Sequence, residues 1–130
     1  MDALLRGART HAAPVAGALL LAAVMLPSGC VWAHVFPDHS EPRVGHEVDA
    51  SPATVRIWFD GDVEPVFSTI RVENGAKQQV DKGDARVDPT DDTVLEVSLP
   101  PLPAGPYQVF WSAVARDGHR TEGSFPFSVK

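Results

Sequence analysis

Apolar and polar residues alternate along most of the chain from residue 54 onward, which is the pattern of β-strands that bury one face. Residues 54–59 (TVRIWF) and 123–129 (GSFPFSV) turn every second, apolar side chain to the same side. Residues 107–115 are apolar on both faces, as expected of a central strand. This region shows the spacing of an amphipathic helix for no more than a turn or two. The pattern therefore predicts an all-β fold.

Two further strands are predicted at residues 66–73 and 93–99. Asn74-Gly75 is a strong hairpin signal, because both residues tolerate positive φ. Residues 81–92 are rich in acidic side chains and are predicted to form a long loop. About seven short strands in roughly a hundred residues are typical of a Greek-key β-sandwich or flattened barrel, as in Ig-like domains. We therefore expect one small domain with a single core.

The N-terminal segment has the three parts of a Sec-type signal peptide in the right order. Arg6 and Arg9 supply the positive region, and residues 15–26 form an uninterrupted apolar run. Val31 and Ala33 then place small side chains at the two positions that a signal peptidase recognises. We expect export, with cleavage after Ala33.

This cleavage would divide the chain into a leader, residues 1–33, and a mature domain, residues 34–130, which we expect in the periplasm. One alternative is an uncleaved membrane anchor, but the apolar run is short for a bilayer span. A second alternative is a lipoprotein, because residues 26–30 (LPSGC) resemble the signal for lipidation of a cysteine, here Cys30. Either alternative would leave the residue after Ala33 inside the chain.

The mature domain would be acidic. Without Asp2, Arg6 and Arg9 of the leader, the 17 acidic and 11 basic residues of the chain become 16 and 9, a net charge of −7 with histidines neutral. Such a surface repels nucleic acid, and no second apolar segment predicts membrane insertion. The only cysteine, Cys30, leaves with the leader. We expect a soluble monomer whose core, without disulfide bonds, holds it together.

The mature domain retains four histidines, namely His34, His39, His46 and His119. Cleavage would make His34 the first residue, so that its α-amine and imidazole could close a six-membered chelate ring around a metal ion. His119 ends the motif Asp117-Gly118-His119 in a predicted turn, where a carboxylate and an imidazole two residues apart can reach the same side. Taken alone, that motif could equally be an ordinary surface turn.

Together, His34, Asp117 and His119 would offer three nitrogens and one oxygen, a donor set that suits a tetragonal Cu(II) ion. Zinc would bind the same set more weakly and prefers a tetrahedron. Cu(I) prefers thiolate or thioether ligands, but every sulfur-containing residue of the chain lies in the leader. We therefore predict one Cu(II) ion per chain.

Other candidate donors stay open as alternatives. His39 and His46 could supply a second, weak site, or they could be exposed bystanders. The strand predicted at residues 54–59 is followed by an acidic cluster of Asp60, Asp62 and Glu64. One of these carboxylates could reach the metal axially. The alternative for these three residues is a solvated acidic turn.

A series of short motifs runs in order through the mature domain: residues 34–36 (HVF), 41–45 (EPRVG), 55–59 (VRIWF), 63–65 (VEP), 102–107 (LPAGPY), 117–119 (DGH) and 123–127 (GSFPF). This ordered set resembles the CopC family, the periplasmic copper-binding domains of copper-resistance systems. No single motif is decisive, but the set spans the whole mature domain.

The resemblance implies a cupredoxin-like Greek-key β-barrel that carries or buffers copper, often beside a CopD-type copper transporter of the inner membrane. It implies a Cu(II) site formed by the N-terminal histidine and the late Asp-x-His motif, here His34, Asp117 and His119. The methionine-rich loop of family members with a Cu(I) site is missing. Some members carry a glutamate near the copper where this chain has Gly61, so that Asp60 or Asp62 would have to substitute.

The sequence thus favours a non-catalytic Cu(II) carrier or buffer in copper homeostasis and resistance. One alternative is an enzyme, because a histidine brace on copper also occurs in oxidative monooxygenases. A second alternative is a metal-free, Ig-like interaction module.

Overall fold

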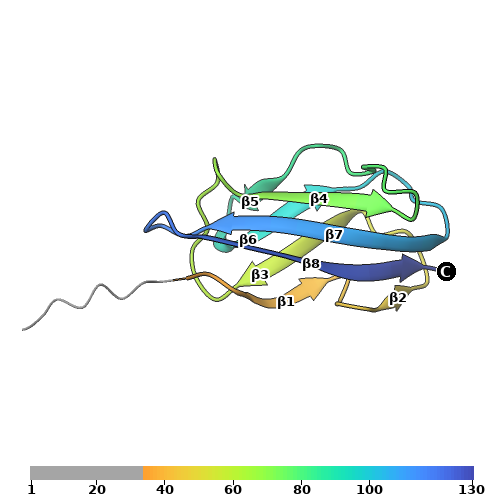
Figure 1. Ribbon diagram of the computed structural model, residues 1–130, viewed down its shortest axis with the longest axis horizontal. Coiled ribbons are helices and arrows are strands. Elements are labelled where there is room, and N and C mark those ends of the chain that lie inside the picture. Colours follow the sequence, from red (N-terminus) through yellow and green to blue (C-terminus); the bar gives the residue numbers. More distant parts are fainter. Residues whose placement is uncertain (1–33) are drawn as a thin grey trace, which may run out of the picture.

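The computed structural model describes residues 34–130, which form eight strands in two four-stranded sheets (Figure 1). The strands are β1 (Pro37–Glu41), β2 (Glu47–Val48), β3 (Thr54–Phe59), β4 (Thr69–Asn74), β5 (Arg86–Asp88), β6 (Asp91–Ser98), β7 (Gly105–Val114) and β8 (Arg120–Val129). This part of the chain contains no helix, and hence none long and apolar enough to cross a membrane. The predicted all-β sandwich is confirmed, with eight strands instead of about seven.

The strand order shows how the chain alternates between the two layers. The first sheet has the order β1-β3-β6-β5, and the second has the order β2-β8-β7-β4. Every connection except β5–β6 and β7–β8 therefore crosses from one sheet to the other, as in a Greek-key sandwich. β7 lies between β8 and β4, which confirms the central strand predicted at residues 107–115, although the strand itself ends at Val114.

The core lies between the sheets and follows the predicted alternation. Val55, Ile57 and Phe59 of β3 are at most 4% exposed, whereas Arg56 and Trp58 point to the other side and are half-buried. β8 contributes its alternate apolar residues from the second sheet. Because both inner faces are apolar and contiguous, packing of the two sheets is the main source of stability.

The prediction of a long loop at residues 81–92 is wrong, because β5 and the start of β6 lie within this segment. Its carboxylates are used locally. Asp88 accepts hydrogen bonds from the backbone and hydroxyl of Thr90 and pairs with Arg56 at 2.6 Å. The pKa of Asp88 is lowered most by the hydrogen bond from the backbone amide of Thr90 and next by the bond from its hydroxyl. The positive charge of Arg56 lowers it further. Composition alone does not reveal such partners, and an acidic run without them is typical of a loop.

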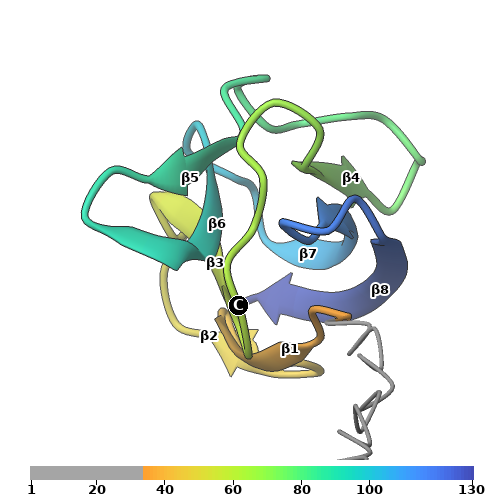
Figure 2. The ribbon, with the colours of Figure 1, turned by 90° about the vertical axis from the view of Figure 1, so that its left-hand side faces the viewer.

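One end of the sandwich gathers three segments that are distant in sequence. The start of the described chain, the connection between β3 and β4 and the turn between β7 and β8 all lie there (Figures 1 and 2). An isolated bridge between Val63 and Ala115 joins the last two segments, and the amide of Glu64 donates to the carbonyl of Val114 at 2.7 Å. This end holds His34, Asp117 and His119, the predicted copper ligands.

Candidate metal site

His34 begins a short extended segment that is fastened to both sheets. The backbone amide of Phe36 donates to Oδ1 of Asp60 at 2.8 Å, and the amide of Asp60 returns a bond to the carbonyl of Phe36 at 2.9 Å. From the second sheet, the hydroxyl of Thr121 donates to the carbonyl of Val35 at 2.6 Å. The side chain of Val35 is 2% exposed and joins the core. His34 is thus exposed but stands on an anchored backbone.

Asp117 and His119 lie in the turn between β7 and β8, whose shape requires a glycine. Gly118 has a φ of 88°, a region that other residues rarely adopt. The turn is closed by the amide of Gly118, which donates to the carbonyl of Ala115, and by the amide of Ala115, which donates to the carbonyl of His119, both at 2.9 Å. Oδ1 of Asp117 accepts the amide of His119 at 3.0 Å. Its Oδ2 lies 3.0 Å from Nδ1 of the same histidine.

The two anchored segments bring His34 and His119 together. Their imidazole ring centroids are 5.4 Å apart, with 46° between the ring planes. Bonds between metals and imidazole nitrogens are about 2 Å long, so two rings on one ion lie within roughly 6 Å of each other. Two imidazoles and an adjacent carboxylate are also the nitrogen and oxygen donors that Cu(II) favours. By separation and by chemistry, these residues fit a copper ion.

The donors are close but not yet arranged as a complete metal site. Within residues 34–130, no three His, Cys, Asp or Glu side chains converge in a geometry ready to hold a metal ion. In the full chain the backbone nitrogen of His34 belongs to the peptide bond with Ala33, so it is not an amine. The carboxylate of Asp117 is directed at His119. An amine donor at His34 would therefore require cleavage after Ala33, and a carboxylate donor from Asp117 would require rotation of its side chain.

The candidate axial donors at this end have other contacts. Asp60 holds the amide of Phe36, as described above. Asp62 and Glu64 lie 3.9 and 3.4 Å from nitrogens of the Arg116 guanidinium. Reaching a metal ion would cost each of these carboxylates its present contact.

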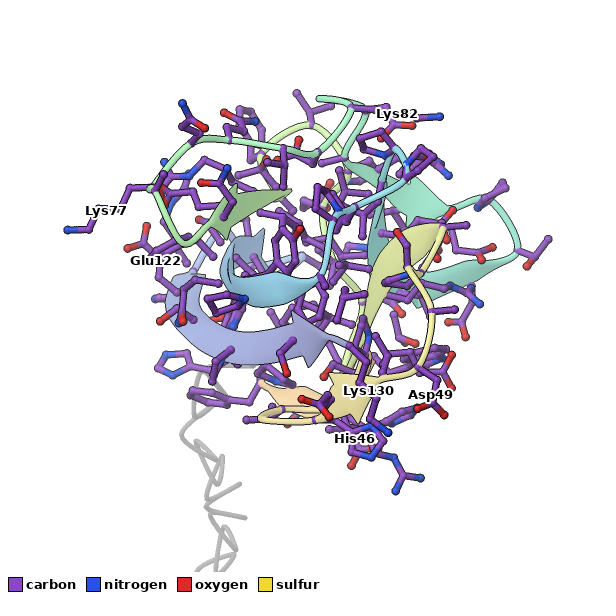
Figure 3. All side chains as sticks on the ribbon, turned by 90° about the vertical axis from the view of Figure 1, so that its right-hand side faces the viewer. His46, Asp49, Lys77, Lys82, Glu122 and Lys130 are labelled. Atoms are coloured by element: carbon purple, nitrogen blue, oxygen red, sulfur yellow. The ribbon has the colours of Figure 1, made fainter. Side chains whose placement is uncertain are left out.

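The two remaining histidines of residues 34–130 lie elsewhere. The ring of His39 stacks on Trp58 with centroids 4.4 Å apart, and its Nδ1 lies 2.9 Å from Asp38. His46 lies at the opposite end of the sandwich, near the C-terminal Lys130, as the view from that side shows (Figure 3). Its carbonyl accepts the amide of Ser128 near the end of β8. The structure thus brings His34 and His119 together and keeps His46 apart from them.

Three residues that contribute to this end were missed from the sequence. Arg116 contacts the acidic cluster and Thr121 holds the backbone next to His34, but neither contact has a local sequence signal. The sequence marks Gly61 only as the position where some family members carry a glutamate. A Cβ at Gly61 would lie 3.2 Å from the side chain of Val35, so a larger residue would press on the anchored segment. The only sequence signal for this role is the small size of Gly61 directly after a predicted strand.

The fold and the paired imidazoles define a β-sandwich domain with a candidate metal site at one end. Residues 38–130 match the CopC domain family. The chain belongs to this family. The predicted leader, residues 1–33, lies outside the described residues.

Relatives and solved structures agree with this assignment. The Bacillus subtilis copper transport protein CutJ is 35% identical over 85% of this chain, which corresponds to 20% of CutJ. Copper resistance protein C of Pseudomonas syringae pv. tomato is 33% identical over 85% of this chain and 92% of its own length. The crystal structure of CopC from Methylosinus trichosporium OB3b superposes with a TM-score of 0.70 at 32% identity and covers 75% of this chain and 94% of that one.

Proposed function

We propose that this protein is an exported Cu(II)-binding protein that carries or buffers copper in copper homeostasis and resistance. One Cu(II) ion per chain would bind to His34, Asp117 and His119. The observation that carries the proposal is the 5.4 Å separation of the His34 and His119 rings at the end of the sandwich. Membership of the CopC family and the similarity to copper resistance protein C support it.

Processing completes the site in this proposal. Cleavage after Ala33 converts the peptide nitrogen of His34 into an α-amine, which joins the imidazole of the same residue in a chelate ring. The hydrogen bonds from Phe36 to Asp60 and from Thr121 to Val35 then fix where this new terminus points. An intact mass that begins at His34 is expected for the exported protein, whereas a lipid-modified Cys30 would contradict this step.

Asp117 can assist the copper ion in two ways. It can turn from His119 and bind the ion through an oxygen. Alternatively, it can keep its position 3.0 Å from Nδ1 of His119 and hold that ring so that Nε2 meets the ion. In both cases the glycine at position 118 keeps the carboxylate and the imidazole on the same turn.

The oxidation state follows from the absence of sulfur. The chain has one cysteine and two methionines, none of which lies beyond Cys30. A mature domain without thiolates or thioethers has only nitrogen and oxygen donors to offer, and these favour Cu(II) over Cu(I). A methionine-rich site of the kind expected for Cu(I) has no counterpart in residues 34–130.

A carrier needs an acceptor, for which we propose a CopD-type copper transporter of the inner membrane. The support is the similarity to CutJ, a copper transport protein in which the matching region makes up 20% of the length. A domain of this kind therefore also occurs within a longer transport polypeptide. The similarity to CutJ therefore favours a copper carrier over a histidine-brace enzyme that turns over a substrate.

The proposal is tested by titrating purified residues 34–130 with Cu(II) in the presence of a competing chelator. We expect saturation at one ion per chain and a tetragonal Cu(II) electron paramagnetic resonance (EPR) spectrum with hyperfine coupling to nitrogen. Failure to compete for Cu(II), or a spectrum with oxygen ligands alone, would contradict the assignment. Reductant-dependent turnover of a polysaccharide by the loaded protein would instead support the enzyme.

A further inference from the structure

Arg116 immediately precedes the Asp117-Gly118-His119 turn and contacts three carboxylates. Its Nη2 lies 3.0 Å from Asp92, its Nη1 3.4 Å from Glu64 and its Nε 3.9 Å from Asp62. Each nitrogen of the planar guanidinium thus faces a different carboxylate. A single Lys ammonium could not reproduce this arrangement, because it is a compact point charge.

These contacts run between the two sheets. Asp92 belongs to β6 of the first sheet, and Asp62 and Glu64 lie in the connection that leaves β3. Arg116 itself extends from the end of β7 in the second sheet. The side chain therefore ties the β7–β8 turn to the opposite layer of the sandwich.

The geometry of the proposed copper site depends on how the two layers are held together, because its two halves stand on different sheets. His34 is continuous with β1 of the first sheet, where Asp60 fixes the neighbouring backbone, and the bond from the Thr121 hydroxyl to Val35 adds a link to the second sheet. Asp117 and His119 stand on the β7–β8 turn of the second sheet. A shift of the turn relative to the first sheet would change the distance between the two imidazoles directly.

We propose that Arg116 is a positioning residue for copper, which holds the Asp117-Gly118-His119 turn in register with His34 through Asp62, Glu64 and Asp92. The inference rests on the proposed function. It gives the acidic cluster after β3 a role as the anchor for Arg116. It also accounts for the contacts of Asp62 and Glu64, which the sequence had left as candidate axial donors or a solvated turn.

Arg120 provides a matched control on the other side of the same motif. It carries the same charge, but its guanidinium donates to Ser112 of β7, within the second sheet. By charge alone, loss of either arginine should favour a bound cation slightly, because a nearby positive charge is removed. Loss of the tie should have the opposite effect, and only for Arg116.

The test compares Arg116→Gln and Arg120→Gln in residues 34–130. We expect Arg116→Gln to weaken Cu(II) binding about two- to fivefold, the range expected when exposed ion pairs are lost. Its EPR spectrum should broaden, because the ligands sample more than one geometry. Arg120→Gln should bind Cu(II) as tightly as the parent or more tightly, with the parent spectrum. Arg116→Lys should restore only part of the affinity.

A second readout needs no copper. Amide hydrogen exchange at Gly118 and His119 should be faster in Arg116→Gln than in Arg120→Gln, while exchange at the buried Val109 stays the same in both variants. Equal rates of amide exchange at Gly118 and His119 in the two variants would overturn the role of Arg116. Equally tight copper binding with identical EPR spectra would also overturn it. If the parent itself failed to bind Cu(II), the proposed function would fail, whereas the exchange data would still decide whether Arg116 holds the turn.

Discussion

The imidazole of His34 lies 5.4 Å from that of His119, across the boundary between the two sheets of the sandwich. His34 leads into β1 of the first sheet, and His119 leads into β8 of the second. Neither half can form the pair alone. The packing of the two sheets therefore sets the distance between the imidazoles of His34 and His119, which lie far apart in the sequence.

Replacing His119 should remove one of the proposed copper donors without disturbing the core. We expect His119→Ala to lower Cu(II) affinity at least about tenfold, or by about 1.4 kcal/mol. The matched control is His46→Ala, because His46 lies at the other end of the sandwich (Figure 3). Competition titrations of both variants measure the difference. Equal losses of affinity would show that copper binds without preference for the candidate site.

Asp60 is expected to position His34 and not to bind copper. Asp60→Ala removes the acceptor for the Phe36 amide and should cost about 0.5–1.5 kcal/mol of unfolding free energy, with weaker Cu(II) binding. Asp60→Asn keeps a side-chain oxygen for that amide and should retain parental affinity. If Asp60 were instead an axial ligand through its charge, both variants would lose affinity alike. Urea unfolding and Cu(II) competition separate these outcomes.

Acidification should weaken the pairing of β5 with β6 first, because the carboxyls with lowered pKa values lie in and around these two strands. The pKa values of Asp84, Asp88 and Asp91 lie below their usual value of 3.8, chiefly through hydrogen bonds from Ser98, Thr90 and Thr93, respectively. A carboxyl with a lowered folded pKa stabilises the fold above its unfolded pKa, and this contribution disappears as the pH falls through the folded value. Stability should therefore drop below about pH 4.

Asp88→Asn tests that dependence. The variant should be less stable than the parent at pH 7, because the charge-assisted contact with Arg56 is lost. The difference should shrink as the pH falls through the lowered pKa of Asp88, because the parental carboxyl then becomes neutral as well. Urea unfolding followed by tryptophan fluorescence measures both stabilities. A difference that stayed constant with pH would show that the ionised form of Asp88 contributes nothing.

Copper release on acidification should occur at a higher pH than the loss of stability caused by protonation of these aspartates. Protons compete with copper for amine and imidazole nitrogens, so binding should weaken as the pH falls through the range in which imidazoles ordinarily titrate. That range lies above the one in which these carboxyls titrate. EPR and circular dichroism recorded on the same samples should show loss of copper while the β-sheet signal persists. Simultaneous loss of both signals would contradict this order.

The strands and their buried faces could be predicted because burial leaves a two-residue period in the sequence. Val55, Ile57 and Phe59 all face the core as expected. β5 could not be predicted, because its one acidic residue, Asp88, is held by Arg56 and by the hydroxyl of Thr90, contacts that composition does not reveal. A pattern of hydrophobicity reports burial, but it does not identify the partners of charged side chains.

The candidate site was predictable in its residues but not in its supports. His34, Asp117 and His119 follow from ligand chemistry, from the cleavage motif and from the resemblance to the CopC family. Arg116 and Asp60 carry no such signal, because their significance depends on contacts between distant segments. Local motifs therefore name candidate ligands, whereas the groups that position them become visible only in the folded chain.

The central claim is that the residue after Ala33 binds copper through a terminal amine. The most direct test compares Cu(II) affinity of residues 34–130 that carry a free α-amine with that of the same residues acetylated at this amine. The chain with the free amine should bind Cu(II) at least about a hundredfold more tightly, or by about 2.7 kcal/mol, because only it can close the chelate ring. Equal affinities for the two chains would contradict the chelate and, with it, the role proposed for His34.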